Sequence, residues 1–226
     1  KGNRLKQTSD CKPLTPLLGV PLIERVIHSA LKAGADDFYV VTGFQEERVR
    51  TFLENLSKRL KISITLIFNE SWEKENGLSV LKAREYLHEP FLLLMADHIF
   101  DPAIARKLMK LSLGKKETAL AVDKKINNPL VDMEDVTRVK TERDKILNIG
   151  KGLKDFNGFD TGIFFCTPSI FRAVEQSAET HNNTTLSGAG RIMAAERRFK
   201  VFEIKGCFWI DVDDPVSLKK AENALL

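Results

Sequence analysis

The stretch FLLLMADHIFDP, at residues 91–102, decides the fold of this chain. Its first six residues are all apolar, which is typical of a strand that other elements cover on both faces. Asp97 follows at the end of that strand. The pair Asp101 and Pro102 then predicts a helix, because an aspartate N-cap followed by proline is a usual helix start. A buried strand that leads directly into a helix indicates an α/β protein.

The segments upstream of this stretch alternate between helical and strand patterns. Apolar residues recur at helical spacing, or gather in short runs rich in β-branched residues. The pattern predicts helices at 21–34, 46–60, 77–87 and 102–113 and strands at 37–43, 62–69 and 90–97. Such alternation favours a mainly parallel, doubly wound sheet. Folds of this kind normally begin with a strand, so we expect a first strand to precede residue 1 in the native polypeptide.

From about residue 117 the pattern changes to an α+β arrangement. It predicts strands at 118–124, 136–150, 158–167 and 199–212 and helices at 168–178 and 214–226. The tetrapeptide ERDK inside 136–150 is the expected hairpin turn. No repeat or low-complexity linker divides the sequence. We therefore expect one domain over residues 1–226, with a first lobe at 1–113 and a second at 114–226 that completes the same sheet.

Composition narrows the class of protein. The 226 residues are 43% hydrophobic and 29% charged, which is usual for a globular protein. The 35 basic and 31 acidic residues are interleaved, so no nucleic-acid-binding stripe is expected. The three cysteines show no metal-binding spacing and indicate reduced thiols in a cytoplasmic setting. No apolar run approaches the roughly 20 residues that a membrane-spanning helix needs.

Carboxylates end two of the predicted strands. Asp97 follows a buried strand, where an isolated charge is costly, and Mg²⁺ is a natural partner for such a group. Asp211 and Asp213 lie on the same face of the strand in CFWIDVDDP. Asp97 could instead cap a turn or helix. Capping is the favoured interpretation for Asp214, which precedes a proline. These acids make a divalent-metal site plausible.

Three basic residues are candidates for an anion site. Lys12 lies in the proline-rich loop CKPLTPLLG, and Lys151 lies between two glycines in IGKGL. Glycine lets the backbone approach a ligand closely. Arg4 lies in KGNRL, at the start of the sequence. Any single lysine is most often a solvated surface residue, so the flanking residues carry this interpretation.

Polar residues at two further junctions could contact a ligand. Asn76, Gly77 and Ser79 lie at a strand-to-helix junction, where they could contact a nucleobase edge or simply cap the helix. The run from Asp160 to Gly162 lies near a strand start and could hold ligand hydroxyl groups. His98 could contact a substrate or pack in the protein. No zinc-ligand spacing, P-loop or G-x-S-x-G string occurs.

Taken together, the motifs resemble the sugar-phosphate nucleotidyltransferases. That family opens with a strand, then G-x-G-x-R-L, P-K-x-L and GxPLIxxVI, and KGNRL, CKPLTPLLG and VPLIERVI match the later part. VVTGF, MADHIF, DTGIFF and FWIDVDDPVSLKKAE follow in the family's order, so the resemblance covers nearly the whole chain. Cys11 stands where the family usually has proline. The resemblance implies a Rossmann-like, mostly parallel mixed sheet flanked by helices, of the nucleotide-diphospho-sugar transferase type.

The resemblance also implies roles for the candidate residues. Asp97 would be one Mg²⁺ ligand and Asp211 or Asp213 the second. The first lobe would bind the nucleotide through Gly2, Arg4, Lys12, Asn76, Gly77 and Ser79. The second lobe would bind a phosphorylated acceptor through Lys151, Asp160, Thr161 and Gly162. Arg4, Lys12 and Lys151 would be the catalytic cations.

NESWEKENGLSVLKAREYL and MADHIFDP are most similar to the members of this family that use CTP and inositol 1-phosphate. We therefore expect a Mg²⁺-dependent cytidylyltransferase in the cytoplasm. In that group the domain is often fused to a membrane-embedded synthase, which would tether it to the membrane face. The alternatives are transfer to another acceptor such as hexose 1-phosphate or choline phosphate, a nucleotide-sugar glycosyltransferase, and a non-catalytic nucleotide-sensing subunit.

Overall fold

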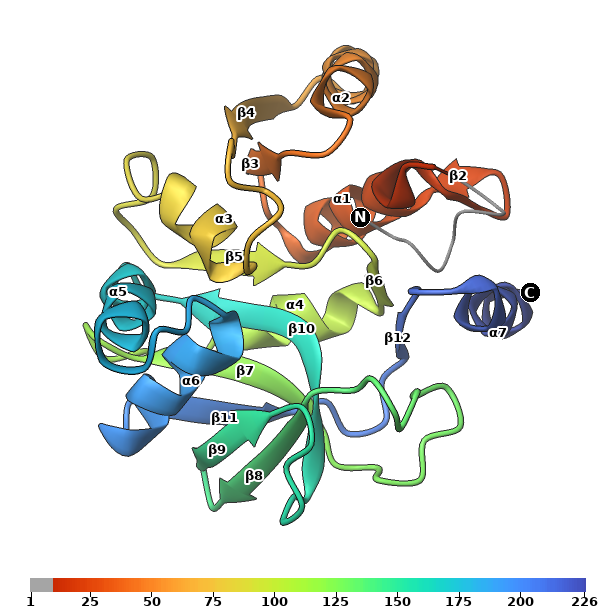
Figure 1. The fold of residues 1–226 in the computed structure, drawn as a ribbon. Coiled ribbons are helices and arrows are strands. Elements are labelled where there is room, and N and C mark those ends of the chain that lie inside the picture. Colours follow the sequence, from red (N-terminus) through yellow and green to blue (C-terminus); the bar gives the residue numbers. More distant parts are fainter. Residues whose placement is uncertain (1–9) are drawn as a thin grey trace.

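Helices and strands alternate along residues 10–226, the part of the chain that the computed structural model describes (Figure 1). The helices are η2 (Lys12–Leu14, a single 3-10 turn), α1 (Leu22–Ala33), α2 (Glu46–Leu60), α3 (Gly77–Lys82), α4 (Pro102–Leu108), α5 (Ser169–His181), α6 (Leu186–Ala195) and α7 (Pro215–Leu225). The strands are β1 (Pro16–Leu17), β2 (Val20–Pro21), β3 (Asp37–Thr42), β4 (Ser63–Phe68), β5 (Phe91–Leu94), β6 (His98–Phe100), β7 (Thr118–Asp123), β8 (Arg138–Glu142), β9 (Lys145–Gly150), β10 (Gly158–Cys166), β11 (Phe199–Glu203) and β12 (Trp209–Asp211).

The strands of residues 10–226 form one large sheet and three small ones. The large sheet has the order β5-β10-β7-β11-β9-β8, and β3 pairs with β4, β6 with β12 and β1 with β2. Among the described strands, β3–β4 and β7–β11 are parallel, whereas β10 runs antiparallel to both β5 and β7. The mixed α/β class is confirmed. Parallel pairing is less extensive than the alternation predicts, because β3 and β4 form a sheet of their own and β10 lies antiparallel between β5 and β7.

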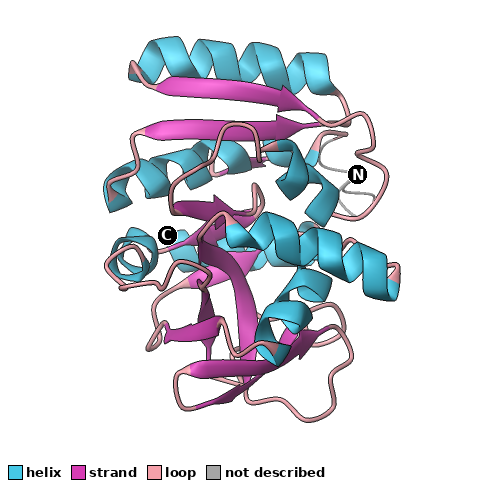
Figure 2. Ribbon diagram, turned by 90° about the vertical axis from the view of Figure 1, so that its left-hand side faces the viewer, coloured by secondary structure: helices cyan, strands magenta, loops and turns pink. Residues whose placement is uncertain are grey.

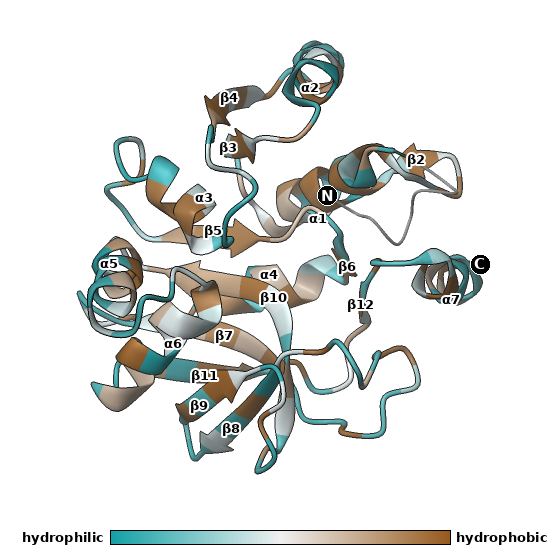
Figure 3. Cartoon of the chain, viewed as in Figure 1, coloured by the Kyte–Doolittle hydropathy of each residue, from teal (hydrophilic) through white to brown (hydrophobic). Residues whose placement is uncertain are grey.

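The layers are separate in side view (Figure 2). Helix α2 covers the outer side of β3 and β4, and α1 lies on their other flank toward the rest of the molecule (Figure 1). Hydrophobic stretches, drawn brown, mark β4, β5 and β9, whereas α2 is largely hydrophilic on its outside (Figure 3). The strand β5, from the first half of the sequence, pairs with β10 from the second half. The two predicted lobes therefore share a sheet.

The apolar core has three parts of unequal size. Two large clusters flank the six-stranded sheet, one around Ile104 and Phe159 and the other around Leu120 and Phe199. A smaller cluster, which includes Leu53, lies under α2. None of the helices between residues 10 and 226 is long and apolar enough to cross a membrane.

Helix α6 is the main element that the sequence pattern does not predict. Its sequence, LSGAGRIMAA, carries two glycines, and glycine lowers helix propensity. Both glycines lie in tight packing positions. A Cβ on Gly188 would overlap Asn183 and Ser177, and a Cβ on Gly190 would lie 2.8 Å from Ile149 Cγ2. The helix begins at the N-cap Thr185, whose side chain accepts a hydrogen bond from the Gly188 amide.

Two predicted helix starts and one helix end are confirmed. Asp101 caps α4 by accepting a hydrogen bond from the Ala103 amide at 2.8 Å. Asp214 caps α7 in a capping box with Ser217. Helix α1 ends at Gly34, which adopts the left-handed conformation with φ of 108°. These caps fix where α4 and α7 begin and where α1 ends, and so limit the connections between these helices and the neighbouring strands.

Candidate active site

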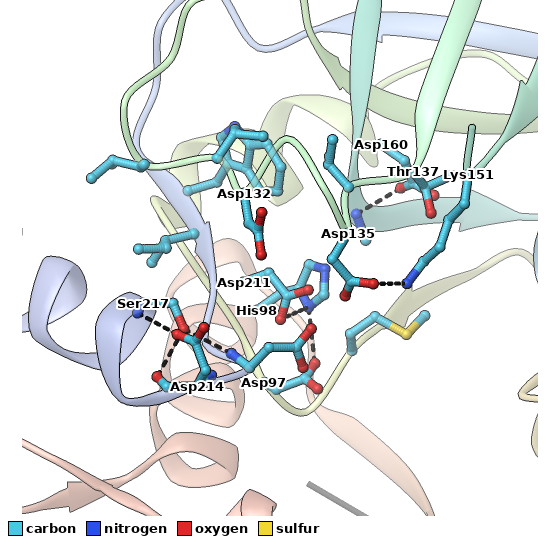
Figure 4. A pocket seen from close by; sticks show the side chains of 18 of the residues that line it. Asp97, His98, Asp132, Asp135, Thr137, Lys151, Asp160, Asp211, Asp214 and Ser217 are labelled. Atoms are coloured by element: carbon cyan, nitrogen blue, oxygen red, sulfur yellow. Dashed lines mark hydrogen bonds and ion pairs between the residues drawn. The ribbon is translucent and has the colours of Figure 1, made fainter. Parts of the chain in front are cut away.

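A pocket of about 520 Å³ lies where several strand ends and loops meet. Its wall comes from the β5–β6 turn, the β12–α7 turn, β10, the start of α6 and the long β7–β8 connection at residues 124–137. This connection, which we call the pocket loop, is green at the lower right of Figure 1. The residues that face the pocket gather toward two ends (Figure 4).

The first end, which we call the carboxylate end, consists of Asp97, Asp211 and Asp213. It depends on the pairing of two short strands, in which the Cα atoms of His98 and Asp211 are direct partners. The Val212 amide also donates to the Asp97 carbonyl oxygen at 3.0 Å. Strand β12, near the end of the sequence, is thus held beside the turn that follows β5.

Lys12 contacts all three acids of the carboxylate end. Its Nζ lies 2.5 Å from Asp97 Oδ2, contacts Asp213 Oδ1, and lies 3.9 Å from Asp211 Oδ1. The lysine side chain is only 12% exposed, so it lies behind the carboxylates rather than across the pocket. Burial alone would lower its pKa, but the negative charges of Asp97, Asp211 and Asp213 raise the pKa above its ordinary value. The ammonium group therefore stays charged.

His98 is the fourth group at the carboxylate end. Its Nδ1 lies 2.9 Å from Asp97 Oδ1 and 3.6 Å from Asp211 Oδ1. Its ring stacks on Trp209 with a centroid distance of 6.4 Å, and a Cβ on Gly162 would overlap it. Burial opposes protonation of this histidine, yet the charges of Asp211 and Asp97 raise its pKa to about 9. His98 is thus a packed residue whose ring faces the acids.

The acids differ in their proton affinity. Burial would raise the pKa of Asp97, but the contacts with His98 and Lys12 lower it below its ordinary value. Burial raises the pKa of Asp211 to about 7, with the charge of Asp97 acting in the same direction and those of His98 and Lys12 opposing it. Asp97 therefore stays ionised more readily than Asp211.

The carboxylate end fits a divalent cation. One ligand atom each from Asp97, His98 and Asp211 lie within 4.8 Å of one another. Asp211 Oδ1 is buried and accepts no hydrogen bond from the described residues. His98 and Lys12 lie 3.6 and 3.9 Å from this oxygen, beyond hydrogen-bond distance, so a closer positive partner would stabilise it. Carboxylate oxygens are ligands that Mg²⁺ prefers, so the chemistry of the donor set suits that ion.

The second end, which we call the loop end, consists of Asp132, Asp135, Thr137 and Lys151. Lys151 Nζ donates to Asp135 Oδ1 at 2.6 Å, and the lysine side chain is 61% exposed. Asp160 lies between the two ends, where its Oδ1 accepts a hydrogen bond from the Gly162 amide at 2.7 Å. Burial raises the pKa of Asp160 to about 6. This end combines an exposed cation with several hydrogen-bond acceptors.

Of the three residues predicted to contact a nucleobase, Asn76 lines the pocket. Its Oδ1 accepts a hydrogen bond from the Leu186 amide at 2.9 Å, which joins the start of α3 to the start of α6. Gly77 is buried so closely against Thr184 that a Cβ would overlap its carbonyl oxygen. Ser79 Oγ accepts a hydrogen bond from Asn69 at 3.0 Å and does not line the pocket. Gly77 and Ser79 thus support the wall behind Asn76.

The other predicted site residues also divide into those that line the pocket and those that do not. The pocket wall includes Asp97, Asp211, Asp213, Lys151, Asp160 and Gly162. Thr161 does not belong to it, because its buried hydroxyl donates to the Ala121 carbonyl oxygen at 2.8 Å. The phosphate contacts predicted for Gly2 and Arg4 lie outside the described residues. Sequence reasoning missed Met95, which the pattern assigns only to the apolar strand, and Asp132, Asp135 and Ser187, which lie in none of the quoted motifs.

The first 149 residues match a family model described as a MobA-like NTP transferase domain. The chain belongs to this family. A curated relative from Aquifex aeolicus, named bifunctional IPC transferase and DIPP synthase, is 32% identical over 100% of this chain and 50% of that protein. A protein of the same name from Thermococcus kodakarensis is 28% identical over 95% of this chain and 46% of its own length. The chain spans about half the length of the curated relatives it matches.

Solved structures agree with this family. The NTP transferase domain superposes on the inositol-1-phosphate CTP transferase from T. maritima with a TM-score of 0.85 and 26% identity, over 98% of this chain and 89% of that one. A UDP-glucose pyrophosphorylase complexed with UDP-glucose gives a TM-score of 0.81 with 19% identity, over 99% and 94% of the two chains. The second likeness concerns the fold alone. Together they confirm the nucleotide-diphospho-sugar transferase type of fold.

Proposed function

We propose that this chain transfers CMP from CTP to inositol 1-phosphate, with Mg²⁺, giving CDP-inositol and pyrophosphate. The names of the relatives, IPC transferase and inositol-1-phosphate CTP transferase, support the choice of substrates. The observation that carries the proposal is the carboxylate end, where Asp97, Asp211 and Asp213 line the same pocket that holds Lys151 at its other end, with Lys12 in contact behind them. Such a pocket suits two polyanions that must meet.

The chemical problem is mainly one of position and charge. A phosphate oxygen of the acceptor attacks the α-phosphorus of CTP in line, and pyrophosphate leaves. Asp97 and Asp211, with Asp213 nearby, would hold Mg²⁺, which offsets charge on the α- and β-phosphates when it is bound. Lys12 keeps its charge among these acids and aligns them. His98 contacts Asp97 Oδ1 and so fixes the direction of that carboxylate.

The loop end would bind the acceptor. Lys151 is exposed and pairs with Asp135, so it can turn toward an acceptor phosphate. Asp160 and Asp135 would accept hydrogen bonds from acceptor hydroxyl groups, which are abundant on inositol. Asn76, which also lines the pocket, would face the nucleotide. No general base is needed, because a phosphate monoester with a second pKa near about 6 is already mostly ionised at neutral pH.

The bifunctional names of the relatives support a second proposal about context. We infer that the product of this domain is passed to a synthase activity that those relatives carry on the same polypeptide. Such a synthase would lie outside these 226 residues. Co-purification of the full-length gene product with native membranes would support this link, and recovery of the full-length product as an isolated single-activity enzyme would contradict it.

A pyrophosphate-release assay tests the proposed reaction. Each of CTP, UTP, ATP and GTP would be combined with inositol 1-phosphate, glucose 1-phosphate, choline phosphate or glycerol phosphate in the presence of Mg²⁺. We expect release to be largest with CTP and inositol 1-phosphate and to cease on addition of EDTA. A nucleotide-sugar glycosyltransferase would release no pyrophosphate in any combination. A nucleotide-sensing subunit would bind CTP without turnover, and either result would overturn the proposal.

A further inference from the structure

Asp123 joins the two ends of the pocket, although it does not line the pocket itself. It is the last residue of β7 and is only 3% exposed. Its carboxylate accepts three hydrogen bonds from three different residues. Among residues 10–226 the structure records no ion pair for this carboxylate. Three N–H donors therefore compensate a buried negative charge, an arrangement that depends on every donor staying in place.

The first two hydrogen bonds shape the pocket loop. Asp123 Oδ1 accepts from the Lys125 amide at 2.9 Å, which turns the chain as the loop begins. Asp123 Oδ2 accepts from Asn128 Nδ2 at 2.8 Å. Asn128 in turn accepts, through its own Oδ1, a hydrogen bond from the Leu130 amide at 3.0 Å. Leu130 lines the pocket, so the carboxylate fixes the segment of the loop that reaches the cavity.

The third hydrogen bond reaches the carboxylate end. Trp209 Nε1 donates to Asp123 Oδ2 at 2.9 Å, and both residues are almost fully buried. Trp209 begins β12, the strand that carries Asp211, and its ring stacks on His98. His98 contacts the carboxylates of both Asp97 and Asp211. The indole of Trp209 thus transmits the position of Asp123 to the acids of the carboxylate end.

The contact through Asn128 to the pocket loop and the contact through Trp209 to β12, which we call the two arms, share one oxygen of Asp123. Asn128 and Trp209 donate to the same Oδ2 atom, so a shift of the loop changes the lone-pair geometry available to the tryptophan. An asparagine in place of Asp123 could keep its one acceptor oxygen toward Asn128 and Trp209 and turn its NH₂ group to the Lys125 amide, so it would spare both arms. An alanine in place of Asp123 removes both acceptor oxygens and therefore breaks both arms.

We propose that Asp123 is a positioning residue that holds the pocket loop and β12 in a single arrangement, so that the acceptor and the metal-binding acids are aligned together. This rests on the proposed function, in which the pocket loop faces the acceptor and β12 carries a metal ligand. The two arms have separate consequences. The Asn128 arm governs how well the acceptor is bound, and the Trp209 arm governs how fast the bound substrates react.

Three variants test the two arms separately, in steady-state assays with CTP, inositol 1-phosphate and Mg²⁺. Asn128→Ala should raise the KM for inositol 1-phosphate about tenfold with little change in kcat, because one charge-assisted hydrogen bond is lost. Trp209→Phe should lower kcat about tenfold and leave that KM almost unchanged. Asp123→Ala, which removes both acceptor oxygens, should do both. Asp155→Asn is the matched control, since Asp155 is a 79% exposed acid paired with Lys140, and it should change neither constant.

Hydrogen exchange of the pocket loop gives a readout that does not depend on turnover. Amides at residues 124–131 should exchange faster in Asp123→Ala and Asn128→Ala than in the wild type, with no substrate present. The proposal is overturned if Asp123→Ala keeps wild-type kinetics, or if the two single-arm variants change KM and kcat in the same proportion. If the wild type shows no CTP turnover, the proposed function fails, whereas unchanged loop exchange in Asp123→Ala refutes the role of Asp123 by itself. If Asp123→Ala does not fold, the single-arm variants still decide.

Discussion

The two ends of the pocket are built in different ways. The carboxylate end rests on paired strands, with Asp211 opposite His98 in the β6–β12 ladder, and its acids share the buried cation of Lys12. The loop end rests on the irregular segment 124–137 and on Lys151, whose side chain is 61% exposed. Strand pairing fixes backbone positions to a fraction of an ångström, whereas a loop tolerates substitution and insertion.

This difference suggests that the two ends of the pocket have different roles in the reaction. The rigid end would carry the step that every nucleotidyltransferase must perform, and the loop end would select the acceptor. If so, substitutions at the rigid end should abolish turnover, whereas substitutions at the loop end should change which acceptor is used and how tightly. The following predictions, in order of expected effect, test that contrast.

Asp97→Asn should have the largest effect. The amide keeps the shape of the side chain but removes the charge that faces Lys12 and the proposed Mg²⁺, so we expect kcat to fall by about 1000-fold. Pyrophosphate release at saturating CTP and inositol 1-phosphate measures this. Asp101→Asn is a matched control in the same stretch, because asparagine also caps helices and α4 should be retained. Equal activity in the two variants would contradict the metal role of Asp97.

Lys12→Met should lower kcat/KM for CTP by about 100-fold and also change the response to metal. Without the ammonium group, three carboxylates repel one another in a partly buried site, which costs about 1–3 kcal/mol of unfolding free energy. Mg²⁺ binding should offset part of this repulsion. We therefore expect Mg²⁺ to raise the Tm of this variant more than that of the wild type, as measured by calorimetry. A wild-type Tm in the absence of Mg²⁺ would be inconsistent with this account.

Lys151→Met should act at the loop end alone. It removes one cation from the proposed acceptor phosphate, so the KM for inositol 1-phosphate should rise about tenfold while the KM for CTP stays constant. Lys154→Met, at a nearby position of the same segment, is the control and should leave both constants unchanged. A rise in the KM for CTP would place Lys151 on the nucleotide instead.

Glu117→Gln should have the smallest effect, because Glu117 is remote from both ends. Its carboxylate lies 2.7 Å from Lys200 Nζ and 3.0 Å from Lys145 Nζ. Burial would raise its pKa, but the bonds from Lys200, the Gly114 amide and Lys145 lower it to about 2 from an ordinary 4.5. The folded state is therefore favoured above pH 4.5, and this contribution is lost as the pH falls through about 2.

Urea unfolding at several pH values measures this contribution. At pH 7 the Glu117→Gln variant should be less stable than the wild type by about 1–2 kcal/mol, after allowance for solvent screening of a side chain that is 20% exposed. The difference should shrink as the pH approaches 2. Turnover at pH 7 should be unchanged. A constant difference across the whole range would mean that packing, rather than charge, stabilises this site.

The sequence predicts the elements whose signals are local. The apolar run before Asp97, the Asp101–Pro102 helix start and the Asp214 cap each depend on a few neighbouring residues, and the structure confirms all three elements. The convergence of Asp97 and Asp211 is different. It needs the antiparallel β6–β12 pair, which joins distant parts of the chain, and no local pattern specifies which strands meet.

The acids of the loop end, unlike Lys151, could not be predicted, for a related reason. Asp132 and Asp135 lie in an irregular segment without periodicity, so nothing distinguishes them from solvated acids. Thr161 illustrates the reverse error. It lies in the motif DTGIFF beside pocket residues, but successive side chains on a strand point to opposite faces, and its hydroxyl bonds the backbone of β7. Motif membership alone does not place a side chain in a cavity.

The contact of Lys12 with both Asp97 and Asp213 has a consequence for folding during synthesis. These partners lie 85 and 201 positions from the lysine along the chain. Contacts that close such long loops form late in folding, because the chain loses conformational entropy on closing the loop before the contact can stabilise it. During synthesis, the ribosome must therefore release nearly all of these 226 residues before the acids can assemble. A nascent chain that lacks β12 can therefore bury most of its core while the carboxylate end of the pocket is still incomplete, because β12 carries Asp211.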